Sequence, residues 1–366
     1  MTGRSATVHR VAMPDPGDAS ALARLIDAGA IDPAGVACIM GKTPGNGLTN
    51  DHTREFATRT VADLLAARLG VGADAVRARV LLLFSGGTEG LLAPHLLVFG
   101  RGAAATNPAA GPALAIGLGR SAPLEPAALG RAAQLDATAD AVRAALADAG
   151  LDAREAVWVQ VKGPIPMPGA MHGPGARGLA AATVAGMKQR SRAASALGVA
   201  VALGDVARDA VGEGLAAAAT IGTRRACVTA AIDSPCVEVM VLGNSSSWSG
   251  DTVVGSTVLA DMLDAPAVAA LLGRLGLAAA PQLSADGRGR LVGAILKGDV
   301  PPGDRLRDAR HVMRDDSDID PIRHYRAAMG GMLGAVTGDS HVYLSAGAEH
   351  QAPPGGAVLA LIVRKR

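Results

Sequence analysis

Short apolar runs rich in β-branched residues alternate along the chain with longer alanine-rich stretches whose apolar positions recur every three to four residues. The first pattern is typical of strands and the second of helices, and their alternation predicts an α/β fold. The predicted strands are Val36–Met40, Val80–Phe84, Ala156–Val161, Val199–Leu203, Val237–Leu242, Leu291–Leu296, His341–Leu344 and Ala357–Val363. The predicted helices are Asp18–Ala28, Thr53–Leu69, Gln134–Ala149, Asp205–Ala219, Ser256–Leu275 and Pro321–Val336. A Pro/Gly-rich stretch, Gly163–Gly178, predicts a loop near a site.

One short motif occurs three times: a hydroxyl residue, two small residues, any residue, and an acid. A single copy would be read as a turn, because Ser-Gly-Gly is common in turns. The first and third copies follow predicted strands, and the second precedes one. The copies are Ser85-Gly86-Gly87-Thr88-Glu89, Thr229-Ala230-Ala231-Ile232-Asp233 and Ser345-Ala346-Gly347-Ala348-Glu349.

The lysines follow the same threefold order. The chain contains five lysines among its 35 basic residues. Three of the five lie at the end of a predicted strand, each upstream of one hydroxyl motif, and an arginine near a predicted helix start lies between lysine and hydroxyl. Alone, such a lysine or arginine would be read as a solvated surface residue. The ordered sets are Lys42, Arg54 and Ser85; Lys162, Arg192 and Thr229; and Lys297, Arg323 and Ser345. They predict three repeat units, 1–104, 112–250 and 255–366, that share one functional site.

These residue types suit attack on a carbonyl. A lysine can act as general base for a serine or threonine hydroxyl once burial and nearby cations lower its pKa. The backbone N–H groups at Gly86, Ala230 and Ala346 can approach a carbonyl oxygen, because small side chains leave room. Arginine supplies a planar fork for imide or carboxylate oxygens. The substrate expected from this set is a small, flat, anionic amide that is itself close to threefold symmetric.

Composition and motif spacing argue against several other classes of protein and site. A chain of 366 residues that is 49% apolar can bury a core, and seven aromatic residues with a net charge of +2 argue against nucleic-acid binding. Three cysteines without a CxxC pair, no apolar leader and no long apolar run favour a cytoplasmic protein without a membrane span. Gly41-Lys42-Thr43 is not a phosphate-binding loop, because Val36 stands at the first glycine position. The histidines lack zinc-site spacing.

Longer segments carry a resemblance to a known family, the ring-opening amidohydrolases, which comprise cyanuric acid hydrolase and barbiturase. The resemblance runs end to end and is strongest in MGKTPGNGLTNDHTRE from Met40, FSGGTEG from Phe84, VQVKGP from Val159, SRAASALG from Ser191 and YLSAGAEHQAPPGG from Tyr343. It implies a toroidal, barrel-like assembly of three homologous α/β repeat units around one central active site. It also implies hydrolytic opening of a cyclic imide, a substrate-binding arginine from each unit, no catalytic cofactor, and a homotetramer.

The resemblance gives the role of nucleophile to the hydroxyl of the middle unit, here Thr229, activated by Lys162. This chain departs from the family there, since the family motif reads Ser-Ala-Gly with a following Glu. Threonine adds a methyl group that restricts χ1, and Ala231 loses the backbone freedom of glycine. Three accounts stay open: Thr229 works with altered geometry, Ser85 or Ser345 has taken over, or the substrate or reaction differs. Cys227 would share the Thr229 face of an extended strand and is the weaker candidate.

The resemblance further implies a structural Mg²⁺ or Ca²⁺ beside the third motif. The oxygen donors would be a carboxylate just after the third lysine and several backbone or amide oxygens, as a hard cation requires. In this sequence Asp299 stands where the family has Glu. The other expected ligands are Ala348, Gln351, Ala352, Pro353 and Gly356.

Three functions remain open at this point. The first is hydrolysis of a cyclic imide, with cyanuric acid preferred over barbituric acid. The second is a diverged reaction on another cyclic amide, motivated by the altered middle motif. The third is a non-catalytic protein that binds small anions.

Overall fold

The structure is a computed structural model that describes residues 4–48, 50–104, 109–166, 184–212, 215 and 221–366. Its contacts divide the chain into two compact units. Unit 1 comprises Met1–Ala115, Asn244–Ala346 and Pro354–Arg366, and unit 2 comprises Ile116–Gly243 and Gly347–Pro353.

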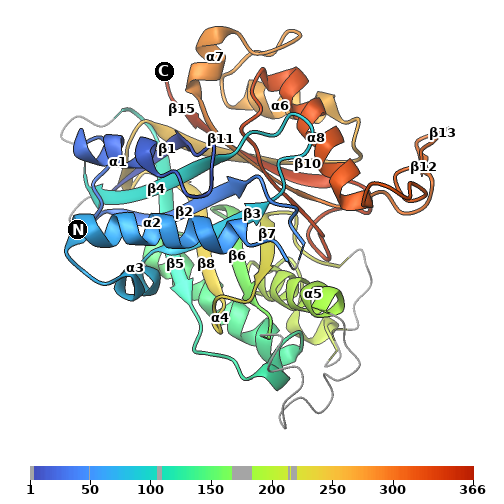
Figure 1. Ribbon diagram of the computed structural model, residues 1–366, viewed down its shortest axis with the longest axis horizontal. Helices are drawn as coiled ribbons and strands as arrows, with labels where there is room; N and C mark the ends of the chain where they lie inside the picture. Colours follow the sequence, from blue (N-terminus) through green and yellow to red (C-terminus); the bar gives the residue numbers. More distant parts are fainter. Residues whose placement is uncertain (1–3, 49, 105–108, 167–183, 213–214, 216–220) are drawn as a thin grey trace. The chain divides into compact units, whose positions relative to one another are not determined.

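The first sheet of unit 1 has the strand order β3-β2-β4-β1-β9. Its strands are β1 Arg4–Ala12, β2 Val36–Thr43, β3 Leu81–Gly86, β4 His95–Ala103 and β9 Trp248–Ser249. The associated helices are α1 Ser20–Asp27, α2 Thr53–Leu69 and α3 Ala73–Arg79. Figure 1 shows α2 beside β2 and β3, where Val61 and Leu65 enter the core cluster. Strand β2 is parallel to β3 and antiparallel to β4, so its fully buried residues face neighbours on both edges.

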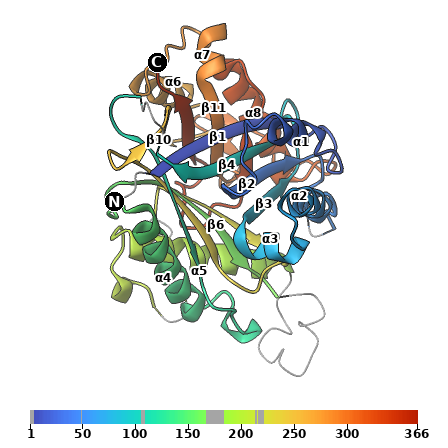
Figure 2. The same ribbon diagram turned by 90° about the vertical axis from the view of Figure 1, so that its left-hand side faces the viewer.

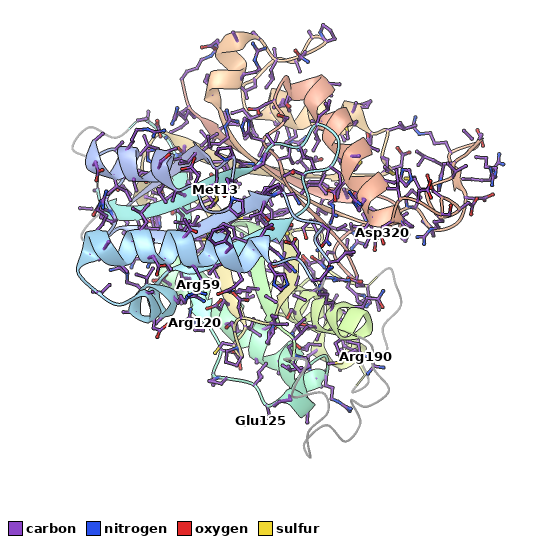
Figure 3. The ribbon with its side chains drawn as sticks, in the orientation of Figure 1. Met13, Arg59, Arg120, Glu125, Arg190 and Asp320 are labelled. Carbon is purple, nitrogen blue, oxygen red and sulfur yellow. The ribbon has the colours of Figure 1, made fainter. Side chains whose placement is uncertain are left out.

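The second sheet of unit 1 has the order β10-β15-β11-β14. Helix α8 begins where the Asp320 carboxylate, labelled in Figure 3, accepts the Ile322 N–H at 2.9 Å, and Pro321 fits the first helical turn. It ends at Gly338 in the left-handed conformation. The strands are β10 Thr252–Leu259, β11 Leu291–Gly298, β14 Tyr343–Ala346 and β15 Ala357–Arg364, with a hairpin β12 Arg305–Leu306 and β13 Ala309–Arg310. The helices are α6 Ala265–Arg274, α7 Ala285–Arg290 and α8 Pro321–Thr337.

The sheet of unit 2 has the order β5-β8-β6-β7. Figure 2 shows α4 and α5 near each other, and they pack closely because small residues line their contact. A Cβ on Gly198 of α5 would lie 2.4 Å from the Leu135 carbonyl oxygen of α4, so only glycine fits there. The strands are β5 Ala113–Arg120, β6 Ala156–Pro164, β7 Ala226–Ala231 and β8 Glu238–Ser245. The helical segments are η1 Pro126–Ala128, α4 Ala132–Ala149, α5 Val184–Ala202 and η4 Arg208–Ala210.

The three four-strand arrangements share one topology. In each, a lysine-bearing strand (β2, β6 or β11) pairs in parallel with the strand of a hydroxyl motif and antiparallel with a later strand. Each lysine strand also carries an irregularity in the antiparallel ladder, between the residues six and four positions before its lysine. The irregular steps are Val36/Cys38, Ala156/Trp158 and Leu291/Gly293.

The mixed α/β class expected from the sequence is confirmed, and several elements differ. Val199–Leu203 was expected to be a strand, but residues 199–202 end helix α5 with Leu203 just beyond, because tertiary packing of this alanine-rich helix buries Val199 and half-buries Val201. Asp205–Ala219 is not a helix over its described residues, which form turns and η4; residues 213–214 and 216–219 lie outside the described chain. Ser256–Leu275 combines the end of β10 with α6. Residues 167–178 of the expected loop also lie outside the described residues.

Eight of the described strands were not predicted from the sequence: β1, β4, β5, β7, β9, β10, β12 and β13. Strand β10 begins at Thr252, before residue 255 where the third repeat unit was expected to start. Among the described residues, no helix combines the length and apolar character needed to cross a bilayer.

Candidate active site

Each sheet places its lysine opposite a hydroxyl residue. The parallel ladders pair Lys42 with Ser85, Lys162 with Thr229, and Lys297 with Ser345. Paired positions on neighbouring strands lie about 4.8 Å apart and present their side chains to the same face. Each ordered lysine of the sequence therefore lies beside its own hydroxyl residue, one such pair in each sheet.

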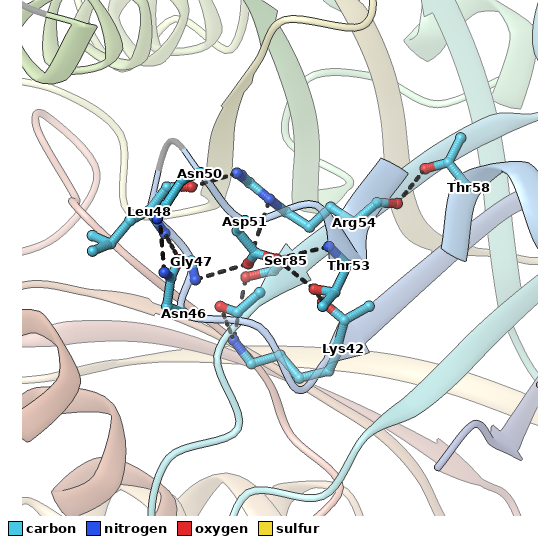
Figure 4. Close-up of polar contacts among 12 residues, drawn as sticks. Lys42, Asn46, Gly47, Leu48, Asn50, Asp51, Thr53, Arg54, Thr58 and Ser85 are labelled. Carbon is cyan, nitrogen blue, oxygen red and sulfur yellow. Dashed lines mark hydrogen bonds and ion pairs between the residues drawn. The ribbon is translucent and has the colours of Figure 1, made fainter. Parts of the chain in front are cut away.

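The Lys42 amine is fully buried in unit 1. Its Nζ atom lies 2.7 Å from the Leu344 carbonyl oxygen, 3.1 Å from the Gly86 carbonyl oxygen and 3.3 Å from Ser85 Oγ, as the Lys42–Ser85 contact in Figure 4 shows. Burial, followed by the positive charge of Arg326, lowers the pKa of Lys42 well below its usual value. A neutral amine has two N–H donors and one lone pair. The Ser85 hydroxyl itself donates to the Leu344 carbonyl oxygen at 3.4 Å, so the amine and the hydroxyl share that acceptor.

Lys297 makes a similar arrangement with the third motif. Its Nζ atom lies 3.0 Å from Ser345 Oγ and 3.1 Å from the Ala346 carbonyl oxygen, and the side chain is fully buried. A second amine–hydroxyl pair is thus present in unit 1.

Lys162 of unit 2 has a different environment. Its Nζ atom donates to Asp233 Oδ2 at 2.7 Å and lies 3.5 Å from Glu238 Oε2. Glu238 is buried on β8 and also contacts Arg120 at the end of β5, labelled in Figure 3. Thr229 donates its hydroxyl to the Val161 carbonyl oxygen at 3.2 Å. The middle pair therefore shows a lysine held by carboxylates beside a hydroxyl bonded to the backbone. Cys227, on the same strand, is fully buried.

Two arginines are clamped by the acids that end the hydroxyl motifs. In unit 1, the buried Arg326 makes a two-point ion pair with Glu89, with oxygens 2.8 and 2.5 Å from its Nε and Nη2 atoms. In unit 2, Arg192 pairs with Glu349 in the same way, at 2.7 and 2.6 Å. Such forks fix the guanidinium plane.

The other expected arginines are less enclosed. Arg323, on α8, is 46% exposed and lies 3.5 Å from Glu89. Arg54 donates to the Leu48 carbonyl oxygen at 2.7 Å and approaches Asp51 at 3.7 Å, near the contacts in Figure 4. Sequence reasoning missed Arg326. The sequence does place Arg326 one helical turn after Arg323. It also places Glu89, a possible ion-pair partner, at the end of the first motif.

A buried histidine lies opposite Lys42 in the antiparallel ladder. His95 contacts the Ala93 carbonyl oxygen through Nδ1 at 2.8 Å and meets the His341 ring edge-on at 5.4 Å. Burial lowers the pKa of His95 to about 3, so the ring stays neutral beside the amine. The corresponding ladder partners of the other two lysines are Glu238 and Val358.

The expected metal ligands are oxygen donors of the type that a hard cation prefers. Asp299 and Gly356 belong to unit 1, where the Asp299 N–H meets the Gly356 carbonyl oxygen at 3.3 Å. In unit 2, the Gln351 side-chain oxygen accepts the Val228 N–H at 2.6 Å and the Ala348 carbonyl accepts the Gln351 N–H at 2.9 Å. The remaining expected ligands, Ala352 and Pro353, lie on that same loop of unit 2. The described residues contain no cluster of three His, Cys, Asp or Glu side chains suited to a metal. The donors fit in type, and the ion stays a prediction.

The chain is similar to known proteins over nearly its whole length. The family model described as amidohydrolase ring-opening protein matches residues 7–364. A cyanuric acid amidohydrolase of Bradyrhizobium diazoefficiens is 41% identical, with 100% of this chain and 99% of the relative covered. A protein named cyclic amide hydrolase from Azorhizobium caulinodans is 38% identical over 98% of this chain and 99% of its own length.

Solved structures show the same similarity. A cyanuric acid hydrolase described as an innovation by structural concatenation has a TM-score of 0.90 at 35% identity, covering 99% of this chain and 100% of that chain. A cyanuric acid hydrolase from A. caulinodans has a TM-score of 0.87 at 40% identity, covering 99% of both chains. The chain belongs to the ring-opening amidohydrolase family, hydrolases that open cyclic amides, as its motifs indicated.

Proposed function

We propose that the protein hydrolyses a cyclic imide, with cyanuric acid as the first substrate to test and barbituric acid as the second. Full-length identity of about 40% to cyanuric acid amidohydrolases supports the substrate class. The observation that carries the chemistry is the buried Lys42 amine with its lowered pKa, whose Nζ atom lies 3.3 Å from Ser85 Oγ.

In this proposal Ser85 Oγ attacks a ring carbonyl carbon while Lys42 Nζ takes the hydroxyl proton. The ring C–N bond then breaks, and the proton passes from Lys42 to the departing ring nitrogen, so that the opened ring remains bound to Ser85 as an ester. Lys42 then accepts a proton from a water molecule as the water oxygen attacks the ester carbonyl carbon. The bond between that carbon and Ser85 Oγ breaks, the proton passes from Lys42 to Ser85 Oγ, and the product is released, which is carboxybiuret when the ring is cyanuric acid. Overall, one water is consumed and one C–N bond is cleaved.

The remaining expected residues bind the ring. Arg54, Arg192 and Arg323 are proposed to hold ring oxygens, since guanidinium forks match imide oxygens. The backbone N–H groups at Gly86, Ala230 and Ala346 are proposed to stabilise the oxyanion of the tetrahedral intermediate. Lys297 and Ser345, whose Nζ and Oγ atoms lie 3.0 Å apart, are the alternative catalytic pair in this proposal.

A ring-opening assay on cyanuric and barbituric acid tests the proposal. Serine-to-alanine substitution at Ser85 should lower kcat/KM by about 10³-fold or more, since nucleophile removal has effects of that order. Thr229→Ala should keep the rate within about tenfold. The reverse result, with Thr229→Ala inactive and Ser85→Ala active, would assign catalysis to Lys162 and Thr229, the pair that the family resemblance implies. Ser345→Ala distinguishes the third pair.

The altered middle motif supports a second candidate, a diverged reaction on another cyclic amide. Turnover of neither ring, together with activity on a cyclic amide indicated by neighbouring genes, would favour it. Ligand-induced stabilisation without product would instead indicate a binding protein.

Quaternary structure and the ion remain parts of the same proposal. The protein is proposed to act as a cytoplasmic homotetramer without a catalytic cofactor, with Mg²⁺ or Ca²⁺ in a structural role. Light scattering of the purified protein and elemental analysis before and after chelation test these two points.

A further inference from the structure

Asp51, in the loop between strand β2 and helix α2, is an acid of unit 1 whose side chain is fully buried. One carboxylate oxygen accepts the Thr53 N–H at 3.0 Å and the Thr53 hydroxyl at 2.5 Å, and the other accepts the Gly47 N–H at 2.8 Å. The Arg54 guanidinium lies 3.7 Å from the second oxygen. A buried carboxylate is costly unless hydrogen bonds and a counter-charge compensate it. The network in Figure 4 supplies both, so the fold keeps a negative charge here.

Two glycines make room for this carboxylate. A Cβ atom on Gly86 would lie 1.7 Å from Asp51 Oδ2, and one on Gly45 would lie 2.0 Å from Asp51 Oδ1. Neither glycine has a φ angle in the left-handed region, so space rather than backbone conformation requires glycine at both positions. The residue that corresponds to Gly86 in the other two hydroxyl motifs is alanine, at Ala230 and Ala346. The first motif thus differs from the others at the residue that Asp51 contacts.

The other two repeats place a different kind of side chain at the position of Asp51. Asp320 of the third repeat also stands three residues before the arginine of its repeat, and it accepts the Ile322 N–H at 2.9 Å much as Asp51 accepts that of Thr53. Asp320 is exposed, however, and so is Gln189, which occupies this position in the second repeat. Of the three residues, only Asp51 is buried against a hydroxyl motif.

Gly86 connects Asp51 to the proposed reacting pair. It follows Ser85 in the chain, and its carbonyl oxygen accepts a hydrogen bond from Lys42 Nζ at 3.1 Å. The nitrogen of Gly47, which donates to Asp51, would lie 3.0 Å from a Cβ atom on Gly86. The loop therefore packs closely on the Gly86 backbone and fixes the directions of its carbonyl and N–H groups. Reaction rates are sensitive to displacements of about 1 Å in such groups.

We propose that Asp51 is a positioning residue of the Lys42–Ser85 pair, which holds the Gly86 backbone in the orientation that ring opening requires. It acts through Gly86 and does not itself touch the reacting atoms. This inference rests on the proposed hydrolysis of a cyclic imide by that pair.

The charge of Asp51 has a second effect, on the Lys42 amine. The charged and titratable side chains that act on this amine are Arg326 of α8, Glu89 after β3, Arg54 of α2, Asp51 before α2 and the neutral His95 of β4. Burial and the cations lower the pKa of Lys42, whereas the two carboxylates raise it. Asp51 thereby limits the lowering and keeps the amine a strong enough base to take the serine proton.

The pH dependence of kcat/KM for Asp51→Asn on cyanuric acid tests the proposal. Asparagine keeps the size and one acceptor oxygen but loses the charge. We expect the acid limb to move to lower pH by about half a pH unit, because Lys42 loses a group that raises its pKa. The plateau should fall by about tenfold or more, because Gly86 is held less firmly. An acid limb that stays in place or moves to higher pH, or a plateau like that of wild type, would overturn the proposal.

Asp320→Asn is the matched control, since it removes the corresponding acid of the third repeat from an exposed site. Asparagine caps helices about as well as aspartate, so limb and plateau should equal those of wild type. Thr53→Val provides a second variant, which removes one hydrogen bond from the Asp51 carboxylate and leaves its charge. Its plateau should fall while its acid limb stays in place. An unchanged plateau in Thr53→Val would also overturn the proposal, even if Asp51→Asn does not fold.

Urea unfolding as a function of pH reports on Lys42 without any substrate. The free energy of unfolding should begin its rise at lower pH in Asp51→Asn than in wild type, because the native amine loses its proton at lower pH. The same onset in both proteins would contradict the effect of Asp51 on the amine. Wild-type protein that opens neither ring, with the shifted onset present, would refute the proposed function and leave the contact of Asp51 with the Lys42–Ser85 pair intact.

Discussion

The fully buried amine of Lys42 should leave a measurable signature in the pH dependence of stability. Its pKa is lowered by burial and by the charge of Arg326, so the native amine is neutral over a range in which the unfolded chain still carries an ammonium. The unfolded state then binds one more proton than the native state. By linkage, the free energy of unfolding rises with pH throughout that range.

The size of the effect follows from the proton count. One proton bound only by the unfolded state gives a slope of about 1.4 kcal/mol per pH unit. The slope begins at the lowered pKa of the native amine and ends near about 10.4, the ordinary pKa of an unfolded lysine. Lys42→Met removes the titrating group from both states, so its stability curve lacks this contribution. The difference between wild type and variant should grow with pH in the same range.

Urea unfolding at a fixed protein concentration, from about pH 6 to about pH 10, measures this difference. Lys365→Met is the matched control, because it also removes a lysine, at a partly exposed site near the C-terminus, and leaves the Lys42–Ser85 pair untouched. Parallel curves for wild type and Lys42→Met would refute the assignment of a neutral Lys42. In the proposed mechanism Lys42 is the general base, so kcat/KM should rise with pH through the pKa of the native amine. In Lys42→Met, kcat/KM should fall by about 10³-fold.

Three further substitutions test other features of the structure. Gly347→Ala should raise KM more than about fivefold by pushing the Arg192 guanidinium away, whereas Gly29→Ala, at a φ of +70° with no neighbour within 4 Å, should cost only about 1 kcal/mol of stability and leave KM unchanged. Burial lowers the pKa of His95 to about 3, so the unfolded chain binds the extra proton between pH 3 and about 6.5 and wild-type stability rises with pH there; His95→Gln should flatten that rise in urea titrations. Arg326→Lys should destabilise the protein by about 2–4 kcal/mol, because lysine cannot reproduce the buried two-point ion pair, and an unchanged unfolding midpoint would contradict that reasoning.

The pairing of lysines with hydroxyls could be predicted because it follows from strand geometry. A lysine at the end of one buried strand and a hydroxyl at the end of its parallel neighbour meet by register, and both positions are visible in the sequence. The arginines were harder to assign. Arg323 and Arg326 lie one turn apart on α8, and only the packed structure shows that the second of them is buried on Glu89.

The elements that escaped prediction share a physical cause. Alanine and glycine dominate the contact of α4 with its neighbours, and such residues carry little periodic signal. Val199 and Val201 therefore suggested a strand, although tertiary packing places both in α5. The end of strand β10 was predicted as part of the helix Ser256–Leu275, because the glycine and hydroxyl residues of β10 interrupt the alternation of apolar and polar positions that is typical of a strand. The contact of Asp233 with Lys162 could not be predicted either, because it depends on how the chain leaves β7 at Ala231.

The repeated irregularity in the lysine strands sets the face of the sheet on which each lysine lies. An extra residue in one strand inverts the alternation of every side chain that follows, so each lysine owes its facing to a bulge six to four positions upstream. The same step stands at the same distance from the lysine in three strands of different sequence. Deleting Ala37, within the first of these steps, would therefore turn Lys42 to the opposite face of its sheet while its two sister lysines kept theirs.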